Sequence, residues 1–364
     1  MRFMWMIIFM VLPFMAIAYV AWHVWAILPF SALWKSVIIL LGISCVVMLF
    51  LNFGRKFDLL PLPVARAAYE TGTSSIIVLL YLVMLFLVLD LGRLLHLVPK
   101  SLLYDNWQSA FSIFVVVFGI FLYGNLHYYN KVRVPLELKS PKPLPKEYKV
   151  VMASDLHLGY HNPRKELARW VDMVNAEHPD FILIAGDIID GSMRPLVEER
   201  MAEEFHRLEA PVYACLGNHE YYAGNPEAQQ FYKEAGIHLL IDEAEVVDSS
   251  IVVIGRDDRT NMRRKPIADL MIQNSSLFTI VLDHQPYNLD RSEAAGVDFQ
   301  LSGHTHRGQV WPISWITDVI YECSWGSHQR GNTQYYVSSG IGIWGGKFRI
   351  GTQSEYVVAT IKCK

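Results

Sequence analysis

The chain has 364 residues, of which 52% are hydrophobic, and its mean hydropathy of +0.23 is high for a soluble protein. Its formal net charge of -3 provides no overall basic field, so we expect no nucleic-acid partner. The cysteines are dispersed without a Cys-x-x-Cys pair, which excludes a dense disulfide framework and a thiolate zinc site. They are Cys45, Cys215, Cys323 and Cys363.

The first 130 residues predict a transmembrane region with four helices. Residues 3–28 contain no formally charged side chain and exceed the roughly 20 residues that a bilayer span requires. A cleaved signal peptide is the alternative, with Ala16-Ile17-Ala18 as its cleavage site, but the apolar run continues to Leu28 and favours a retained helix. Further apolar runs cover 36–53, 74–95 and 110–129.

The distribution of lysine and arginine predicts the orientation of these spans. If four helices alternate, most basic residues near the membrane fall on one side, and this side should be cytoplasmic. Both termini and everything after residue 130 would then be cytoplasmic, in what we expect to be a bacterial inner membrane. Three or five spans would reverse the prediction.

Residues 131–147 predict a linker, because four prolines stand among lysines without helical or strand periodicity. The lysines either contact anionic headgroups or are simply solvated. A proline-rich segment is a semi-rigid spacer, so the following domain would stay close to the bilayer.

From residue 148 to 364 the pattern alternates between short apolar runs and helical periodicity, which is typical of an α/β domain. Helices are expected over 165–176 and 196–208. Strands are expected over 150–153, 181–185, 212–216, 251–254, 278–282, 299–301, 335–337 and 356–361.

Polar motifs follow five of these strands, where open α/β sheets place their ligands. The motifs are Asp155-x-His157, Gly186-Asp187-x-x-Asp190, Gly217-Asn218-His219-Glu220, His284 after Asp283, and Gly303-His304-x-His306. Together, and in this order, they resemble the calcineurin-type metallophosphoesterase family over roughly residues 148–362. The resemblance implies a β-sandwich core flanked by helices.

The resemblance also implies a site for two divalent metal ions. Asp155, His157 and His306 would hold one ion, Asn218, His284 and His304 the other, and Asp187 would bridge them. Oxygen and imidazole ligands without thiolate suit Mn, Fe or Zn better than a hydrated Mg ion, and we expect Mn first. Two such ions can clamp a phosphoryl group and activate a water for in-line attack.

His219 and Asp190 are the candidate catalytic pair. His219 would stabilise or protonate the leaving oxygen, and the resemblance implies that Asp190 orients its ring. The alternatives are a surface loop histidine and a helix N-cap before Met193.

Candidate substrate contacts lie near the end of the chain. Arg307, next to His306, would contact a second phosphate or point to solvent, and Arg349 resembles a family arginine that approaches the site. His328 lies in a loop that could reach the substrate. The stretch 311–325 is rich in Trp and Ile without clear periodicity, so it either packs in the core or forms an apolar lobe against the bilayer or an acyl chain.

These observations favour a membrane-anchored, metal-dependent hydrolase of a phosphodiester, pyrophosphate or phosphomonoester, with a lipid-linked substrate and membrane lipid as partners. Relatives that cleave the nucleotide pyrophosphate of a lipid A precursor share the Ser-Asp-Leu-His opening. The alternatives are an enzyme for a soluble nucleotide with helices only as an anchor, and a non-enzymatic membrane sensor. The sequence predicts no oligomeric state.

Overall fold

The computed structural model describes residues 2–51, 56–272 and 276–363, with side chains from residue 11 onward. The chain divides into two compact units. The first comprises Met1–Asn125 with Gly345–Lys347, and the second comprises Leu126–Trp344 with Phe348–Lys364. Residues 52 and 53, at the end of the predicted second span, lie outside the described residues.

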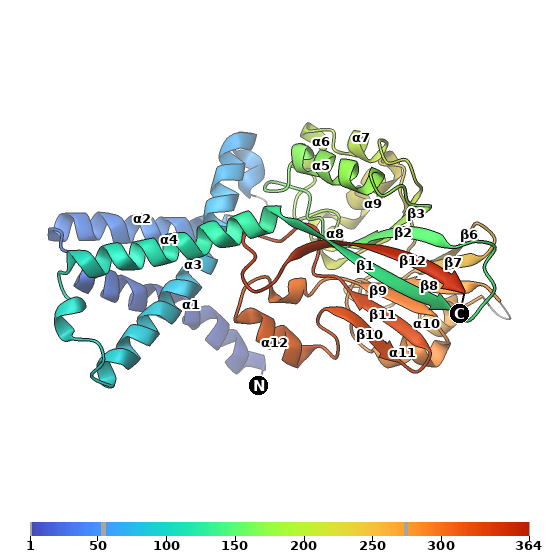
Figure 1. The fold of residues 1–364 in the computed structure, drawn as a ribbon. Coiled ribbons are helices and arrows are strands. Elements are labelled where there is room, and N and C mark those ends of the chain that lie inside the picture. The colour runs from blue at the N-terminus through green and yellow to red at the C-terminus, as the bar shows by residue number, and fades with distance from the viewer. Residues whose placement is uncertain (1, 52–55, 273–275, 364) are drawn as a thin grey trace. The chain divides into compact units, whose positions relative to one another are not determined.

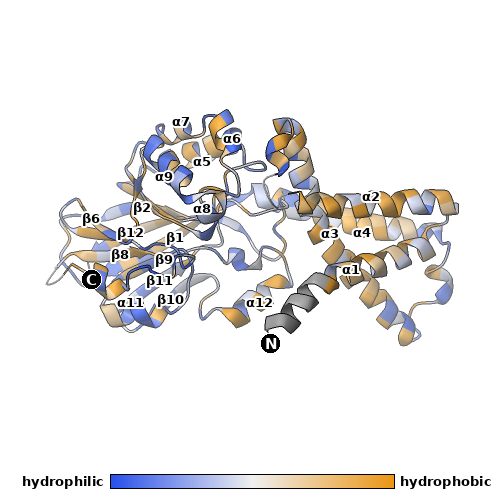
Figure 2. Cartoon of the chain, turned by 180° about the vertical axis from the view of Figure 1, so that it is seen from behind, coloured by the Kyte–Doolittle hydropathy of each residue, from blue (hydrophilic) through white to orange (hydrophobic). Residues whose placement is uncertain are grey.

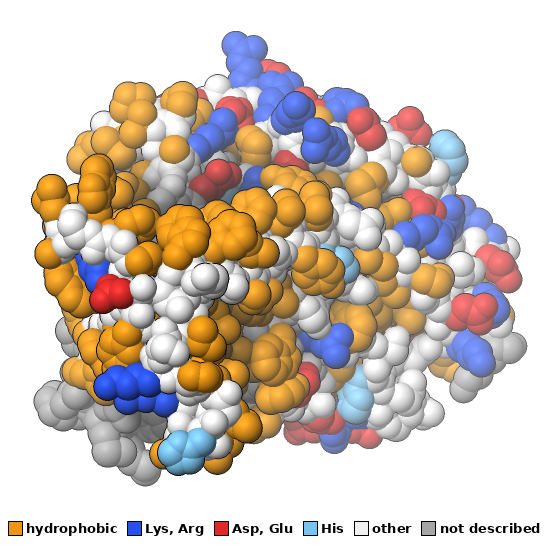
Figure 3. Space-filling view, turned by 60° about the vertical axis from the view of Figure 1, so that its left-hand side comes forward, with side chains coloured by type: hydrophobic (Ala, Val, Ile, Leu, Met, Phe, Trp, Pro, Cys, Tyr) orange, Lys and Arg blue, Asp and Glu red, His pale blue; other side chains and the backbone are white. Residues whose placement is uncertain are grey.

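The first unit is helical and largely apolar at its surface. Its helices are α1 (Arg2–Ile27), α2 (Ala32–Phe50), α3 (Leu62–Leu94) and α4 (Trp107–Tyr129), with short 3-10 turns η1 (Lys56–Leu59) and η2 (Lys100–Leu102). Figure 3 shows many apolar side chains on an exposed face. Among the described residues, three helices, α2, α3 and α4, are long and apolar enough to cross a membrane, which confirms membrane-capable helices in this region.

Two details differ from the predicted spans. The third helix starts at Leu62, well before residue 74, because the polar residues between these positions do not interrupt its hydrogen bonding. In α1, the described apolar stretch Val11–Ile27 is shorter than a full span, so a fourth crossing stays a prediction.

Polar side chains, of which His23 and Lys35 are buried, link the helices of this unit. Asp90 of α3 accepts a 2.7 Å hydrogen bond from the Tyr19 hydroxyl and lies 3.1 Å from Nε2 of the buried His23, both on α1. Lys35 forms a 2.7 Å ion pair with Asp105. Such groups are costly in an apolar environment unless they pair, so the Asp90 contacts hold α1 against α3, and the Lys35–Asp105 pair joins α2 to the loop before α4.

The second unit contains two six-stranded mixed sheets (Figure 1). The first has the order β1 (Lys131–Ser140), β12 (Ser354–Cys363), β2 (Tyr148–Ala153), β3 (Phe181–Ala185), β4 (Val212–Cys215), β5 (His238–Leu239). The second has the order β10 (Gly326–Arg330), β11 (Thr333–Val337), β9 (Phe299–Ser302), β8 (Phe278–Leu282), β7 (Ile251–Gly255), β6 (Glu243–Val247). All eight strands expected from the sequence are present.

Successive side chains point to opposite faces of each strand, and their packing on both faces of the two sheets produces a four-layer sandwich. Val150 and Met152 of β2 share one core with Ile280 and Leu282 of β8, so the two sheets pack face to face. Val151, on the opposite face, packs in a second core with α5 (Arg164–Asn175), α7 (Ala202–Phe205) and α9 (Asn225–Glu234). The outer face of the second sheet packs against α10 (Ile267–Leu270). The remaining helices are α6 (Arg194–Glu198), α8 (Asn218–Ala223), α11 (Leu289–Ala295), α12 (Ile313–Ile320) and the turn η3 (His306–Gly308).

The predicted linker over 131–147 is wrong in its first ten residues. Residues 131–140 form β1, which pairs in parallel with β12 along its whole length. Pro135 is tolerated because β1 lies at the edge of the sheet, where one side of the strand needs no ladder partner. Only Asn130 separates α4 from β1, so the second unit, which begins at Leu126, continues from the last turn of α4 into its first strand with no linker.

Two helix predictions also change. The expected helix over 196–208 is divided into α6 and α7, and Arg200 between them has a left-handed backbone with φ of 52°. The stretch 311–325, which has no clear periodicity over its full length, contains the eight-residue helix α12.

Candidate metal centre

The candidate ligands converge because they follow neighbouring strand ends. Asp155 and His157 come after β2, Asp187 after β3 and Asn218 after β4, and these three strands are parallel neighbours. His284 follows β8, and His304 with His306 follows β9, again a parallel pair. The carboxyl ends of parallel strands meet at one edge, so the two sheets deliver all seven side chains to one place.

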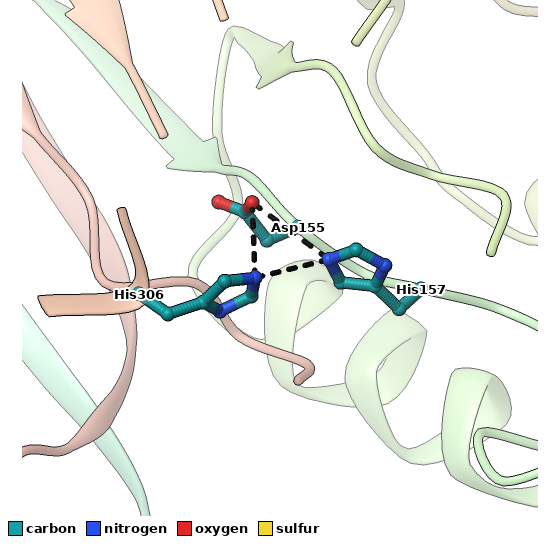
Figure 4. Close-up of side chains that lie close together, drawn as sticks. All are labelled: Asp155, His157 and His306. Carbon is teal, nitrogen blue, oxygen red and sulfur yellow. Dashed lines mark hydrogen bonds and ion pairs between the residues drawn. The ribbon is translucent and has the colours of Figure 1, made fainter. Parts of the chain in front are cut away.

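One group consists of Asp155, His157 and His306 (Figure 4). The His306 Nε2 atom lies 3.4 Å from Asp155 Oδ1 and 3.0 Å from His157 Nε2. Asp155 and His157 are fully buried. One carboxylate oxygen and two imidazole nitrogens directed at one point form a suitable donor set for a divalent transition-metal ion.

The second group consists of Asp187, His284 and His304. His284 Nε2 lies 3.1 Å from Asp187 Oδ2, and the same oxygen lies 3.7 Å from His157 Nε2 of the first group. The Asp187 carboxylate therefore stands between the two groups. Asn218 Oδ1 is buried and has no hydrogen-bond partner among the described residues, which fits a ligand oxygen.

Two of the histidines, His304 and His306, are held in the neutral form that metal binding requires, whereas at His284 the charge of Asp187 outweighs burial and raises the pKa well above its usual value. Burial lowers the pKa of His304 to about 4 and holds the pKa of His306 well below its usual value. His284 Nδ1 lies 2.7 Å from the Ala185 carbonyl oxygen. A donor proton on Nδ1 leaves Nε2 free for an ion, an arrangement that is common around metal-binding histidines.

Five of the candidate ligands have a left-handed backbone. The φ angles are 55° for Asp155, 46° for His157, 52° for Asp187, 71° for His304 and 46° for His306. This conformation costs a residue with a Cβ atom about 1–2 kcal/mol. Such strain concentrates at functional sites, where the surrounding structure holds it in place.

Glycines beside the carboxylates provide the space that the ligands occupy. A Cβ atom at Gly217 would lie 2.1 Å from Asp187 Oδ1, and one at Gly303 would lie 2.3 Å from Asp155 Oδ2. No larger residue fits these positions without displacing a candidate ligand.

His219 and Asp190 lie next to each other in the structure. His219 Nδ1 lies 3.2 Å from Asp190 Oδ1, and that oxygen also lies 3.3 Å from His157 Nδ1. Burial alone would lower the pKa of His219, but the charges of Asp187 and Asp190 outweigh it and raise the pKa to about 9. A protonated imidazole beside the metal groups can stabilise negative charge or supply a proton.

Glu220 has a role that the sequence analysis missed. Its fully buried carboxylate accepts hydrogen bonds from the backbone N–H groups of Gly217 at 2.7 Å, Asp187 at 3.2 Å and Ile189 at 3.0 Å. Tyr232 donates a fourth, at 3.0 Å. Glu220 thus fixes the loops of two metal motifs to each other. The sequence signal for this role is the position of Glu220 at the end of the motif Gly217-Asn218-His219-Glu220.

Arg349 requires a correction, because its side chain is fully buried and not open to a substrate. Its guanidinium donates to the Ser354 hydroxyl and to four backbone carbonyls, those of His306, Ser339, Gly340 and Gly342. These contacts take up the N–H groups that a phosphate would need. Arg349 therefore supports the loop that carries His306.

The other two candidate substrate contacts differ in their surroundings. The Arg307 guanidinium stacks on the Trp325 ring at 4.1 Å from its centroid, and no carboxylate pairs with it among the described residues. His328 lies on β10, the edge strand of the second sheet, and its Nε2 is 3.1 Å from Glu322 Oε1. Arg307 thus keeps a free cation beside His306, whereas His328 belongs to a surface ion-pair cluster with Arg330.

Comparison with known proteins agrees with this geometry. Residues 148–308 match the family model described as calcineurin-like phosphoesterase. An uncharacterised metallophosphoesterase of Campylobacter jejuni is 30% identical over 271 residues, covering 71% of each chain. One of Aquifex aeolicus is 33% identical over 235 residues, covering 61% of this chain and 88% of its own.

A relative from Danio rerio, named as a transmembrane protein with a metallophosphoesterase domain, is 30% identical over 250 residues, covering 64% of this chain and 56% of its own. The grouped aspartates and histidines and these relatives together place the chain in the calcineurin-like metallophosphoesterase family, as a metal-dependent phosphoesterase with membrane-capable helices.

Proposed function

We propose that this phosphoesterase is membrane-anchored and hydrolyses a lipid-linked phosphodiester or pyrophosphate at the cytoplasmic face. The observation that carries the proposal is the direct connection of α4 to β1 through Asn130 alone. A helix able to cross the membrane thus continues into the edge strand of the catalytic domain. Such a short connection favours a substrate that also resides in the bilayer.

Two divalent ions, with Mn²⁺ as the first candidate, would be held by the two side-chain groups and Asn218. When bound, they would supply the Lewis acidity that polarises the phosphoryl group and activates water. Asp187 stands between the groups and would hold both ions at a common carboxylate. Glu220 and Arg349 keep the ligand loops in position.

His219 is the proposed proton donor to the leaving oxygen. Its Nδ1 faces Asp190, so Nε2 is the atom left to face the substrate. Arg307 would contact a second phosphate or a neighbouring anionic group, because its guanidinium stacks on Trp325 beside His306. This arrangement suits a pyrophosphate or diester better than an isolated monoester.

The test uses the full-length protein in lipid nanodiscs with Mn²⁺ and a panel of lipid phosphates, lipid-linked pyrophosphates and soluble nucleotides. We expect at least tenfold higher kcat/KM on a lipid-linked member than on any nucleotide. Asp187→Asn serves as the inactive control, and Asp172→Asn, an exposed site on α5, as the matched control. Faster turnover of a soluble nucleotide, unchanged by lipid, would instead assign the helices to anchoring alone.

A further inference from the structure

Helix α12 presents an apolar face to solvent in the catalytic unit. Trp315, Ile316, Val319 and Ile320 are all exposed, Trp315 by 62% and Val319 by 86%. Their spacing places them on one side of the helix, and Ser314 is its one buried residue. Figure 2 shows α12 as a mainly hydrophobic helix. Its single charged residue, Asp318, accepts a hydrogen bond from Ser324 and is thereby partnered.

The helix is fixed to the metal loop at both ends. At its start, a Cβ atom on Gly308 would lie 2.5 Å from the backbone of Ile313, so the first turn rests on the residue two positions after His306. After its end, the Ser324 carbonyl accepts a 2.6 Å hydrogen bond from Thr305, which stands between His304 and His306. A surface that binds α12 is therefore connected, through these contacts, to the loop that carries the candidate metal ligands His304 and His306.

We propose that α12 inserts its apolar face into the headgroup boundary of the bilayer that anchors this chain. The connection through Asn130 keeps the catalytic unit next to the membrane at all times, so the bilayer is the apolar surface always within reach. A short amphipathic helix with tryptophan on its apolar side is suited to this interface. Trp311, whose ring lies 5.3 Å from that of Trp315, extends the same surface.

The consequence for the enzyme concerns its substrate, and this step rests on the proposed function. A docked α12 holds the loop of His304, His306 and Arg307 at the depth where lipid phosphates lie. The bilayer then presents the scissile phosphate to the metals, and a lipid substrate need not leave the membrane. Soluble substrates would gain nothing from the docking.

The direct test measures the depth of α12 without using activity. In a Cys45→Ser, Cys363→Ser background, Val319→Cys is labelled with a nitrobenzoxadiazole dye in nanodiscs of phosphatidylcholine and phosphatidylglycerol. The matched control is Val197→Cys on α6, whose valine is 67% exposed in the same unit. Spin-labelled lipid should quench the Val319 label at least twofold and leave the Val197 label unchanged. Equal quenching at both sites would overturn the proposal. The proposal would also fail if the Val319 label is shielded from solvent only until the protein is diluted in detergent, because a second copy of the chain would then be what covers α12.

A second arm connects docking to catalysis. The variant Ile316→Glu/Val319→Glu should lose at least tenfold in kcat/KM on the lipid-linked substrate and keep wild-type turnover of bis(p-nitrophenyl) phosphate, with Val197→Glu unaffected on both. Equal loss on both substrates would overturn the coupling. If the unmutated enzyme ignores lipid substrates while Val319 is still quenched, the proposed substrate fails and the docking stands.

Discussion

The guanidinium of Arg349 donates a 2.8 Å hydrogen bond to the backbone carbonyl of His306. This contact fixes a metal-ligand loop whose backbone is left-handed at His306 and at Arg307. A buried cation here holds a strained segment in place and leaves the task of substrate contact to other groups. Its removal tests this assignment.

Arg349→Met should lower the metal content and the melting temperature and leave KM for a soluble phosphodiester nearly unchanged. Loss of the guanidinium leaves buried carbonyls without donors, and breaking such a buried charged network costs about 3–5 kcal/mol. Metal analysis of the purified protein and a thermal melt measure both effects. A variant with full metal content and a strongly raised KM would restore the original phosphate-contact prediction.

Glu220→Ala should destabilise the catalytic unit and abolish metal binding. The substitution leaves three buried backbone N–H groups without acceptors, at roughly 1–3 kcal/mol each. Glu220→Gln keeps one acceptor oxygen and should show an intermediate melting temperature. The neighbouring exposed Glu227→Ala serves as the control. Normal metal content in the alanine variant would contradict the role assigned to Glu220.

His219→Ala should reduce kcat by about 10²–10⁴-fold on a substrate with an alkoxide leaving group. The loss should be much smaller with p-nitrophenolate, which leaves without a proton donor. Asp190→Asn should show the same leaving-group dependence in milder form, because it weakens the orientation of His219. Kinetics on the two substrates at constant metal content measure this. Equal losses on both would argue that His219 acts through metal binding.

Chelation should abolish turnover, and added Mn²⁺ should restore it in the wild type and in Asp172→Asn but not in Asp187→Asn. Asp187 stands between the two side-chain groups, so its loss removes a ligand from both. The activity regained with Mn²⁺, Fe²⁺, Zn²⁺ and Mg²⁺ would rank the metals. Full recovery of Asp187→Asn would show that the bridging assignment is wrong.

Glu177 links β1 to the body of the catalytic unit and makes its stability pH-dependent. The pKa of Glu177 is lowered to about 2 by hydrogen bonds from Arg133 on β1 and Lys149 on β2, which outweigh the opposing effect of burial. A carboxylate with a lowered pKa stabilises the fold at neutral pH, and this contribution is lost as pH falls from about 4.5 towards 2.

Glu177→Gln should therefore lower the melting temperature at pH 7 and converge with the wild type in acid. Melts between pH 7 and pH 3 test this. A difference that does not shrink with falling pH would exclude the ion pairs as its cause.

The sequence alone determined the fold class, the membrane-capable helices and the candidate ligands. Short apolar runs identified every strand of the metal site, because these strands are buried along almost their whole length. Polar residues placed after such strands, as in Asp155-x-His157, have few structural reasons to recur five times in one chain.

Tertiary structure decided what depends on contacts between distant residues. The strand β1 was hidden because prolines and lysines are acceptable at a sheet edge, and only its pairing with β12 reveals it. Arg349 became a support of the His306 loop, and Glu220 a link between two motifs, because their partners lie far away in sequence. The exposure of α12 likewise depends on packing. The sequence of the eight residues of α12 does not by itself show whether the helix faces a core or a bilayer.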